Sequence, residues 1–163
     1  MPNELTKEDV ELLLSYDATT GHMTWRVDRG KGRAGERAGT RHPHGYRQIK
    51  LKGRLYLTHR LAWLLMTGAW PRHTVDHING DRTDDRFENL RDVPQGINSQ
   101  NRRKPQRNNT TGFLGVTERQ GRFRAAVQSP SGKTHAAGSY ATAEEAHAAY
   151  IDKKRELHEG CTI

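Results

Sequence analysis

A stretch of ten residues beyond the middle of the chain, 102–111 (RRKPQRNNTT), contains no side chain suited to a hydrophobic core. Polar stretches of this kind favour exposed connections, so we expect this one to separate two parts that pack independently. Only 33% of the 163 residues are hydrophobic, and the mean hydropathy is −0.97. Little apolar surface is therefore available for burial, which predicts one or two small domains rather than a large enzyme core.

Charge is unevenly distributed along the chain. Residues 26–60 carry eleven Lys and Arg against two acids, and residues 98–135 carry eight against one. The segment between them, 61–97, holds six acids against four arginines. An acidic centre with two basic flanks predicts a polyanionic partner, because Lys and Arg that neutralise phosphates release condensed counterions. Charge alone leaves RNA, anionic lipid and acidic proteins open beside DNA.

Several classes of protein are excluded by the sequence. A single cysteine, Cys161, excludes an intramolecular disulfide and a multi-cysteine zinc site, and it fits a reducing compartment. The chain contains no run of about 18 apolar residues, the length needed to span a membrane. The acidic N-terminus lacks the basic and then apolar order of a secretory signal. We therefore expect a cytoplasmic protein.

The first part of the chain predicts mixed helix and sheet. We expect a helix over 4–15, a strand around 23–27, and a hairpin of strands 46–51 and 54–57 that turns at Lys52-Gly53. Thr58 is expected to cap a helix that runs to about Met66 and stops at Gly68.

The last part predicts a simpler unit. Three strand-like segments, 113–117, 122–128 and 134–140, precede a helix that ends near residue 158. Thr142 followed three residues later by Glu145 is a capping box, which marks the start of that helix. The simplest arrangement is a three-stranded sheet backed by one helix. The fold class of the whole chain is predicted as α+β, with a β-rich arm at 1–57, a central core at 58–103, a basic linker at 104–111 and a sheet-and-helix domain at 112–160.

The central segment contains the most informative pattern. Asn79-Gly80 between two short strand-like pieces is the strongest local hairpin signal available. It would fold residues 75–77 back towards the sequence that follows. Asn89 comes 12 residues after His77, and Asn98 comes 9 residues later, where a helix could begin. An order of strand, loop, strand and helix would bring together the side chains of Asp76, His77, Asn89 and Asn98.

Residues 75–103, VDHINGDRTDDRFENLRDVPQGINSQNRR, resemble the HNH (His-Me finger, ββα-metal) endonucleases in the form whose last histidine is an asparagine. With THRLAW at 58–63, the likeness covers 58–103, and its spacing is most similar to that of phage intron-associated homing endonucleases. The resemblance implies a ββα-metal core in which Asp76 and Asn98 supply oxygen ligands to one divalent cation, Mg²⁺ or Mn²⁺. It also implies that His77 is the general base and that Asn89 holds the loop that orients His77.

The chemistry of phosphodiester hydrolysis agrees with this set of residues. The reaction needs an activated water, charge relief on the phosphoryl oxygens and a stabilised leaving oxygen. A histidine that titrates near neutral pH can activate the water, and a hard cation on oxygen ligands can do the rest. The family leaves a 5′-phosphate and a 3′-hydroxyl. Because Asn98 offers a neutral amide oxygen, weaker metal affinity is expected than with histidine.

Other assignments compete at the same segment. Asn101 is a rival to Asn98 for the ligand position. Three aspartates in the loop could also ligate a metal, but we expect solvated turn residues at Asp81, Asp84 and Asp85. His59 could contact a phosphate, although a histidine packed beside Trp63 is the more ordinary interpretation. The remaining histidines have no mutual metal-binding spacing, so no zinc site is predicted.

The last third of the chain resembles the Apetala/ethylene-response-factor DNA-binding domain. The matching pieces are GFLGV at 112–116, RFRA at 122–125, GSY at 138–140, TAEEA at 142–146 and AAY at 148–150. Phe123 stands where that family often has tryptophan, a change that should preserve core packing. Within a strand, Arg122 and Arg124 would share one face while Phe123, Ala125 and Val127 pack on the helix. The arginine face could enter a major groove, and the predicted DNA contacts are Arg119, Arg122, Arg124 and, on phosphate, Lys133.

Two further basic segments flank the central core. Four cations between core and C-terminal domain are well placed to follow the DNA backbone or minor groove: Arg102, Arg103, Lys104 and Arg107. The N-terminal arm resembles the segment that precedes the HNH core in many phage members. Its aromatic residues Trp25, Tyr46 and Tyr56 are expected in a core rather than against bases.

The sequence therefore predicts a metal-dependent DNA endonuclease of the phage homing type. It would act on a recognised site in double-stranded DNA as a monomer or weak dimer, in the bacterial host cytoplasm if phage-encoded. A non-enzymatic DNA-binding regulator with a decayed HNH fold is the alternative from another class. A nuclease directed at RNA is a second alternative.

Overall fold

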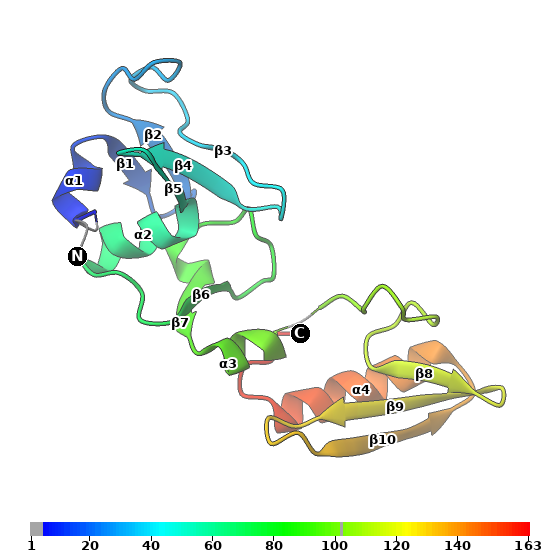
Figure 1. Cartoon of the computed structure of the whole chain (residues 1–163). Coiled ribbons are helices and arrows are strands. Elements are labelled where there is room, and N and C mark those ends of the chain that lie inside the picture. The colour runs from blue at the N-terminus through cyan, green and yellow to red at the C-terminus, as the bar shows by residue number, and fades with distance from the viewer. Residues whose placement is uncertain (1–4, 102) are drawn as a thin grey trace. The chain divides into compact units, whose positions relative to one another are not determined.

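A computed structural model describes residues 5–101 and 103–163 and divides the chain into two compact units, Met1–Val93 and Pro94–Ile163 (Figure 1). Both units combine helices and strands, which confirms the α+β class. The division lies inside the predicted central core, between its second strand and its helix. Arg102, one of the predicted DNA contacts, lies outside the described residues.

The first unit begins with a helix shorter than predicted. Helix α1 spans Lys7–Glu11 and starts at Thr6, which forms a capping box with Asp9. The prediction that the helix continues to residue 15 is wrong, because strand β1 (Leu14–Asp17) pairs antiparallel with β2 (His22–Trp25). Leu14 is fully buried in this pairing, whereas Leu12 is 71% exposed. Burial of the strand has therefore overridden the local preference for helix.

A three-stranded sheet follows, in the order β3-β4-β5. Its strands are β3 (Thr40–Arg41), β4 (Arg47–Leu51) and β5 (Arg54–Leu57). The predicted hairpin is confirmed, since Leu51 pairs with Arg54 across the two-residue turn. Lys52 and Gly53 have φ values of 45° and 83°. Positive φ at both central positions is the geometry of a type I′ turn, which matches the twist of the strands.

Helix α2 (Thr58–Thr67) leads from this sheet to the last hairpin of the unit. Gly68, with φ of 77°, ends the helix as predicted. The prediction that Thr58 caps the helix is wrong, because Leu57 is the N-cap and Thr58 is the first helical residue. The Thr58 hydroxyl instead contacts the Asp85 carboxylate. Thr58 therefore forms a tertiary hydrogen bond and not the local cap that the sequence predicts.

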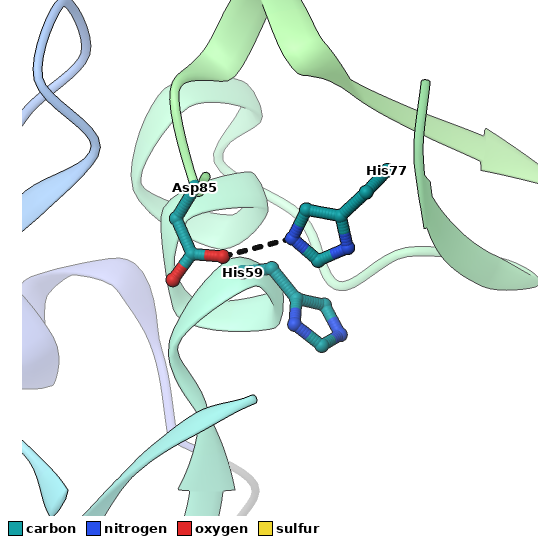
Figure 2. Close-up of side chains that lie close together, drawn as sticks. All are labelled: His59, His77 and Asp85. Carbon is teal, nitrogen blue, oxygen red and sulfur yellow. Dashed lines mark hydrogen bonds and ion pairs between the residues drawn. The ribbon is translucent and has the colours of Figure 1, made fainter. Parts of the chain in front are cut away.

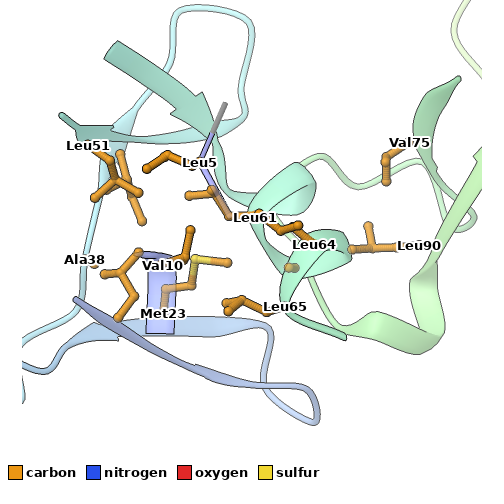
Figure 3. Packing of buried hydrophobic residues seen from close by; sticks show 13 residues of the cluster. Leu5, Val10, Met23, Ala38, Leu51, Leu61, Leu64, Leu65, Val75 and Leu90 are labelled. Atoms are coloured by element: carbon orange, nitrogen blue, oxygen red, sulfur yellow. The ribbon is translucent and has the colours of Figure 1, made fainter. Parts of the chain in front are cut away.

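Strands β6 (Thr74–His77) and β7 (Leu90–Val93) form this last hairpin, in which Asp76 pairs with Arg91 and His77 with Leu90. A loop that contains the short helix η1 (Phe87–Asn89) joins them. One hydrophobic core holds the unit together (Figure 3). It joins α1, the N-terminal strands, α2 and the β6-β7 hairpin. The predicted N-terminal arm and the hairpin that carries His77 thus share a core.

The second unit contains α3 (Gln95–Gln100), β8 (Val116–Arg119), β9 (Arg122–Gln128), β10 (Thr134–Tyr140) and α4 (Ala143–Leu157). The predicted three-stranded sheet and its helix are confirmed, in the order β10-β9-β8. The capping box of Thr142 and Glu145 is confirmed too. Ala125 and Val127 of β9 are buried with Ala146 and Tyr150 of α4. Within the described residues, no helix is sufficiently long and apolar to cross a membrane.

Candidate active site

Strand β6 positions the first two predicted site residues. Asp76 and His77 are 8% and 3% exposed. Arg91, the register partner of Asp76 on β7, donates two hydrogen bonds to Asp76 Oδ2, from Nη2 at 2.8 Å and from Nε at 3.0 Å. The buried carboxylate is thereby compensated by a guanidinium, as a buried charge requires.

Asn89 fixes the loop between the two strands. Its Oδ1 accepts the backbone N–H of Asn79 at 2.9 Å. Its Nδ2 donates to Asn79 Oδ1 at 3.0 Å and to the Asp84 carbonyl at 2.8 Å. The backbone carbonyl of Asn89 accepts the N–H of Ile78 at 2.8 Å. The buried side chain of Asn89 thus joins both sides of the loop that directly follows His77.

Asp85 corrects a prediction. We expected the three loop aspartates to be solvated, but Asp85 is 2% exposed and its Oδ1 lies 2.9 Å from His77 Nε2. Its Oδ2 contacts the Thr58 hydroxyl, and its carbonyl accepts the Tyr16 hydroxyl at 2.7 Å. The cause is tertiary, because these partners come from β1, α2 and β6.

The other two loop aspartates remain at the surface or close to it. Asp81 is exposed and accepts hydrogen bonds from Thr83. Asp84 pairs with Arg86, with Oδ2 and Nη2 2.8 Å apart. Hydrogen bonds from Arg86 hold the pKa of Asp84 down at about 2. The prediction therefore agrees with the structure best for Asp81, and it fails for Asp85.

His59 lies beside His77 and Asp85 (Figure 2). It comes from the first turn of α2 and is 4% exposed. Its ring centroid lies 5.0 Å from that of His77, edge to face, while Trp63 packs on Phe87. Burial lowers the pKa of His59 to about 4, so the ring is neutral at neutral pH. Its Nδ1 is buried and has no hydrogen-bond partner.

Tyr46 covers the two histidines. Its ring centroid lies 5.1 Å from that of His59 and 5.9 Å from that of His77. Arg82 lies over the Tyr46 ring, with its guanidinium carbon 5.0 Å from the ring centroid. Trp25 and Tyr56 pack against the core as predicted. Tyr46 instead belongs to the histidine cluster.

The predicted amide ligand lies in the second unit. Asn98 is half-buried in α3, and Asn101 forms the C-cap of that helix. The Oδ1 of Asn101 accepts a hydrogen bond from the Thr162 hydroxyl. The Asn101 amide thus has a partner near the C-terminus, and the choice of Asn98 as the ligand stays a prediction.

The predicted DNA contacts of the second unit lie on exposed positions. Arg119, Arg122, Arg124 and Lys133 are all exposed, and the burial along β9 alternates as the sequence predicts. Arg122 Nη2 donates to the Ser139 carbonyl at 2.9 Å. Arg103 donates to the Thr162 carbonyl at 2.7 Å, and Lys104 and Arg107 are exposed.

The segment that carries most of this site matches a known protein family. Residues 56–100 match the sequence model of the HNH endonuclease family. The match supports a nuclease, that is, a hydrolase of phosphodiester bonds, and it implies a nucleic-acid substrate and a divalent metal ion. No curated protein and no solved structure shows significant similarity to the chain.

Sequence reasoning missed the surroundings of His77. Asp85 is the last of three similar aspartates in a polar loop, and nothing in the local pattern distinguishes it from Asp81. Thr58 and His59 read as a helix start. The available signal was that Thr58 and His59 begin an apolar helix within the segment that matches the HNH family.

Proposed function

We propose that this chain is a metal-dependent DNA endonuclease of the homing type that hydrolyses phosphodiester bonds at a recognised site and leaves a 5′-phosphate and a 3′-hydroxyl. The observation that carries the proposal is the arrangement within the matched segment. His77 is held by Asp85, its neighbour Asp76 is buried on the same strand, and Asn89 ties the loop between the strands. A fixed histidine beside buried carboxylates is suited to acid–base chemistry on a phosphate ester.

His77 is the proposed general base. With its Nε2 proton donated to Asp85, the lone pair of the neutral imidazole resides on Nδ1, which would take the proton from the attacking water. Asp85 fixes this tautomer and the orientation of the ring, and Thr58 in turn fixes Asp85. Asn89 acts through the loop rather than on the substrate.

Asp76 and Asn98 are the proposed ligands of the catalytic cation, Mg²⁺ or Mn²⁺. A carboxylate and an amide oxygen are hard donors, and they fit cations that prefer oxygen. A bound divalent cation would neutralise charge on the phosphoryl oxygens and stabilise the leaving oxygen. Arg91 already compensates Oδ2 of Asp76, so Asp76 must offer its other oxygen or release Arg91.

The second unit is proposed to bind double-stranded DNA in the manner of the ethylene-response-factor domain. The supporting observation is a sheet whose one face is packed on α4 while Arg122 and Arg124 lie exposed on the other. Arg119 and Lys133 would extend this surface, and Arg103, Lys104 and Arg107, together with Arg102, would contact the backbone. We propose that the protein acts in the cytoplasm as a monomer or weak dimer.

A plasmid nicking assay tests the function. The purified chain should convert supercoiled plasmid to nicked or linear form with Mg²⁺ or Mn²⁺, and it should lose this activity in EDTA. His77→Ala should lower cleavage by at least about 100-fold, as expected for loss of a general base. DNA binding, measured by fluorescence anisotropy in Ca²⁺, should remain nearly unchanged.

His22→Ala is the matched control, because His22 is an exposed histidine of the same unit. It should cleave as the wild type does. Full cleavage by the His77→Ala variant would remove the assignment of the base. Equal competition by structured RNA and duplex DNA would redirect the proposal to an RNA nuclease.

The Asp76–Arg91 ion pair is the one observation that favours a second function, a DNA-binding regulator with an inactive nuclease fold. A carboxylate bound twice by a guanidinium is a poor metal ligand until the pair opens. Under this alternative the wild type binds DNA tightly and cuts none with either metal. The same nicking assay therefore separates the two functions.

A further inference from the structure

The cluster of His59, His77 and Asp85 exceeds what the proposed hydrolysis needs (Figure 2). The reaction requires His77 and a group that orients it, and Asp85 serves as that group. A second buried histidine has no role in this scheme. Its position is nevertheless specific, because each of the three residues offers one ligand atom within 4.8 Å of the others, and all three are buried.

His59 Nδ1 is the independent sign that a ligand is missing from the cluster. The atom is buried and has no hydrogen-bond partner, and the whole residue is only 4% exposed. A buried polar atom normally has a partner, because an unpaired one loses its hydrogen bonds to water and gains none in return. A metal ion bound by His59 through Nδ1 would supply that partner.

We propose that His59, His77 and Asp85 bind one transition-metal ion of the Zn²⁺ class, and that the bound ion inhibits cleavage by withdrawing His77 from catalysis. The site itself is independent of the proposed nuclease function, whereas the inhibition rests on it. This proposal replaces the expectation, drawn from spacing along the chain, that no zinc site exists. The three ligands come from α2, β6 and the loop before η1, so no local spacing could reveal them.

The donor set distinguishes this site from the proposed site of the hard cation. Two imidazoles and one carboxylate suit Zn²⁺ and its neighbours in the transition series, whereas Mg²⁺ prefers oxygen ligands and retains its waters. Ligands of a tetrahedral zinc ion lie roughly 3.4 Å apart, given bond lengths of about 2.0–2.2 Å. His77 Nε2 and Asp85 Oδ1 are already 2.9 Å apart. A tetrahedral site would need this pair to separate by roughly 0.5 Å, and the widest of the three separations, which is at most 4.8 Å, to close by up to about 1.4 Å.

Inhibition follows from the electronic structure of imidazole. A neutral ring has one N–H and one lone pair. Coordination occupies that lone pair, whichever of the two nitrogens binds the ion. His77 in the metal-bound site therefore cannot accept a proton from water, and the proposed base is lost while the fold is retained.

Zinc binding to the full-length chain tests the site without reference to cleavage. Isothermal titration of metal-free protein with Zn²⁺ should give one site, and His59→Gln should weaken it by more than about tenfold, the scale of effects seen for groups that support metal sites. His44→Gln is the matched control. His44 is an exposed histidine whose ring lies 5.2 Å from that of His42, and this pair is the alternative place for an adventitious zinc ion. Equal affinity in His59→Gln, or loss of binding in His44→Gln, would overturn the site.

A measurement on the wild type covers the case in which the buried substitution prevents folding. Imidazole ¹⁵N spectra should show that Zn²⁺ shifts the ring signals of His59 and His77 and leaves those of His22 and His44 in place. Shifts confined to His42 and His44 would contradict the proposal.

Inhibition is measured by adding Zn²⁺ to the nicking assay at constant Mg²⁺. The wild type should lose cleavage at the zinc concentrations that fill the site. Unchanged cleavage at full occupancy would overturn the inhibitory role. If the chain cuts no DNA with any metal, the nuclease proposal fails, while titration and spectra still decide the zinc site.

Discussion

Asn89 shows how much of the candidate site depends on a single buried side chain. Its amide spans the loop from Asn79 to Asp84, using both its oxygen and its nitrogen. This loop contains Asp85, which orients His77. A change in this loop therefore reaches His77, the proposed base, through hydrogen bonds.

Replacement of Asn89 is expected to reduce stability and turnover together. Asn89→Ala leaves buried groups of the loop without partners and should cost about 1–3 kcal/mol of the free energy of unfolding. Turnover should fall more than DNA affinity does, because the loop holds Asp85 against His77, the proposed base. Urea denaturation and single-turnover cleavage measure the two effects.

Asn89→Asp is the matched control for this prediction. The carboxylate keeps an oxygen for the Asn79 N–H but cannot donate to the Asp84 carbonyl. The stability of Asn89→Asp should lie between those of the wild type and Asn89→Ala if the hydrogen bonds to Asn79 and to Asp84 both contribute. Equal stability of the alanine variant and the wild type would show that Asn89 does not hold the loop.

At the scale of elements, the packing of α4 on the sheet depends on one close approach. Gly115 precedes β8 with φ of 74°, and a Cβ at this position would lie 2.0 Å from the Tyr150 ring. Gly112 has a similar φ of 76°, but a Cβ there would meet nothing within 4 Å. Substitutions at the two glycines therefore distinguish the cost of a strained backbone from the cost of a steric clash with Tyr150.

Gly112→Ala should destabilise the second unit by about 1 kcal/mol, the cost of a left-handed backbone for an L residue. Gly115→Ala should cost a further 1–3 kcal/mol or so, because the added methyl forces Tyr150 out of the core. Thermal unfolding of both variants, followed by Tyr150 side-chain NMR signals, measures the difference. Similar losses in the two variants would mean that the Tyr150 contact is unimportant.

At the scale of the whole molecule, positive charge exceeds negative charge by eight, and its placement matters more than its sum. Arg122 and Arg124 stand on the sheet face opposite the core of the second unit. Arg155 stands on α4, exposed and paired with Asp152. A comparison of these arginines separates a specific DNA-binding face from general attraction by a basic protein.

Arg122→Ala and Arg124→Ala should each weaken DNA binding and reduce the slope of log affinity against log salt by about 1 if the contact is to phosphate. Arg155→Ala should leave both quantities nearly as they are. Anisotropy titrations from low to physiological salt provide the measurement. An equal change in all three variants would indicate diffuse attraction and would argue against binding by the sheet face.

The sequence alone determined the elements whose signals are local. The type I′ turn at Lys52-Gly53, the stop at Gly68 and the capping box of Thr142 and Glu145 depend on backbone preferences within four residues, and all are present. The alternation along β9 is equally local, because successive side chains of a strand point to opposite faces. The pattern from Asp76 to Asn98 indicated an HNH endonuclease segment for the same reason, since its spacing lies within one short stretch of chain.

Only the tertiary structure decided which polar residues surround His77. Thr58 and His59 come from α2, Asp85 from the loop before η1 and Tyr46 from the segment before β4, and their convergence depends on how these elements pack around one core. The end of α1 was decided in the same way, because residues 14–17 gain more from pairing with β2 than from one further helical turn. Local preferences act over a few residues, whereas burial and hydrogen bonding to distant partners choose among the states that those preferences leave open.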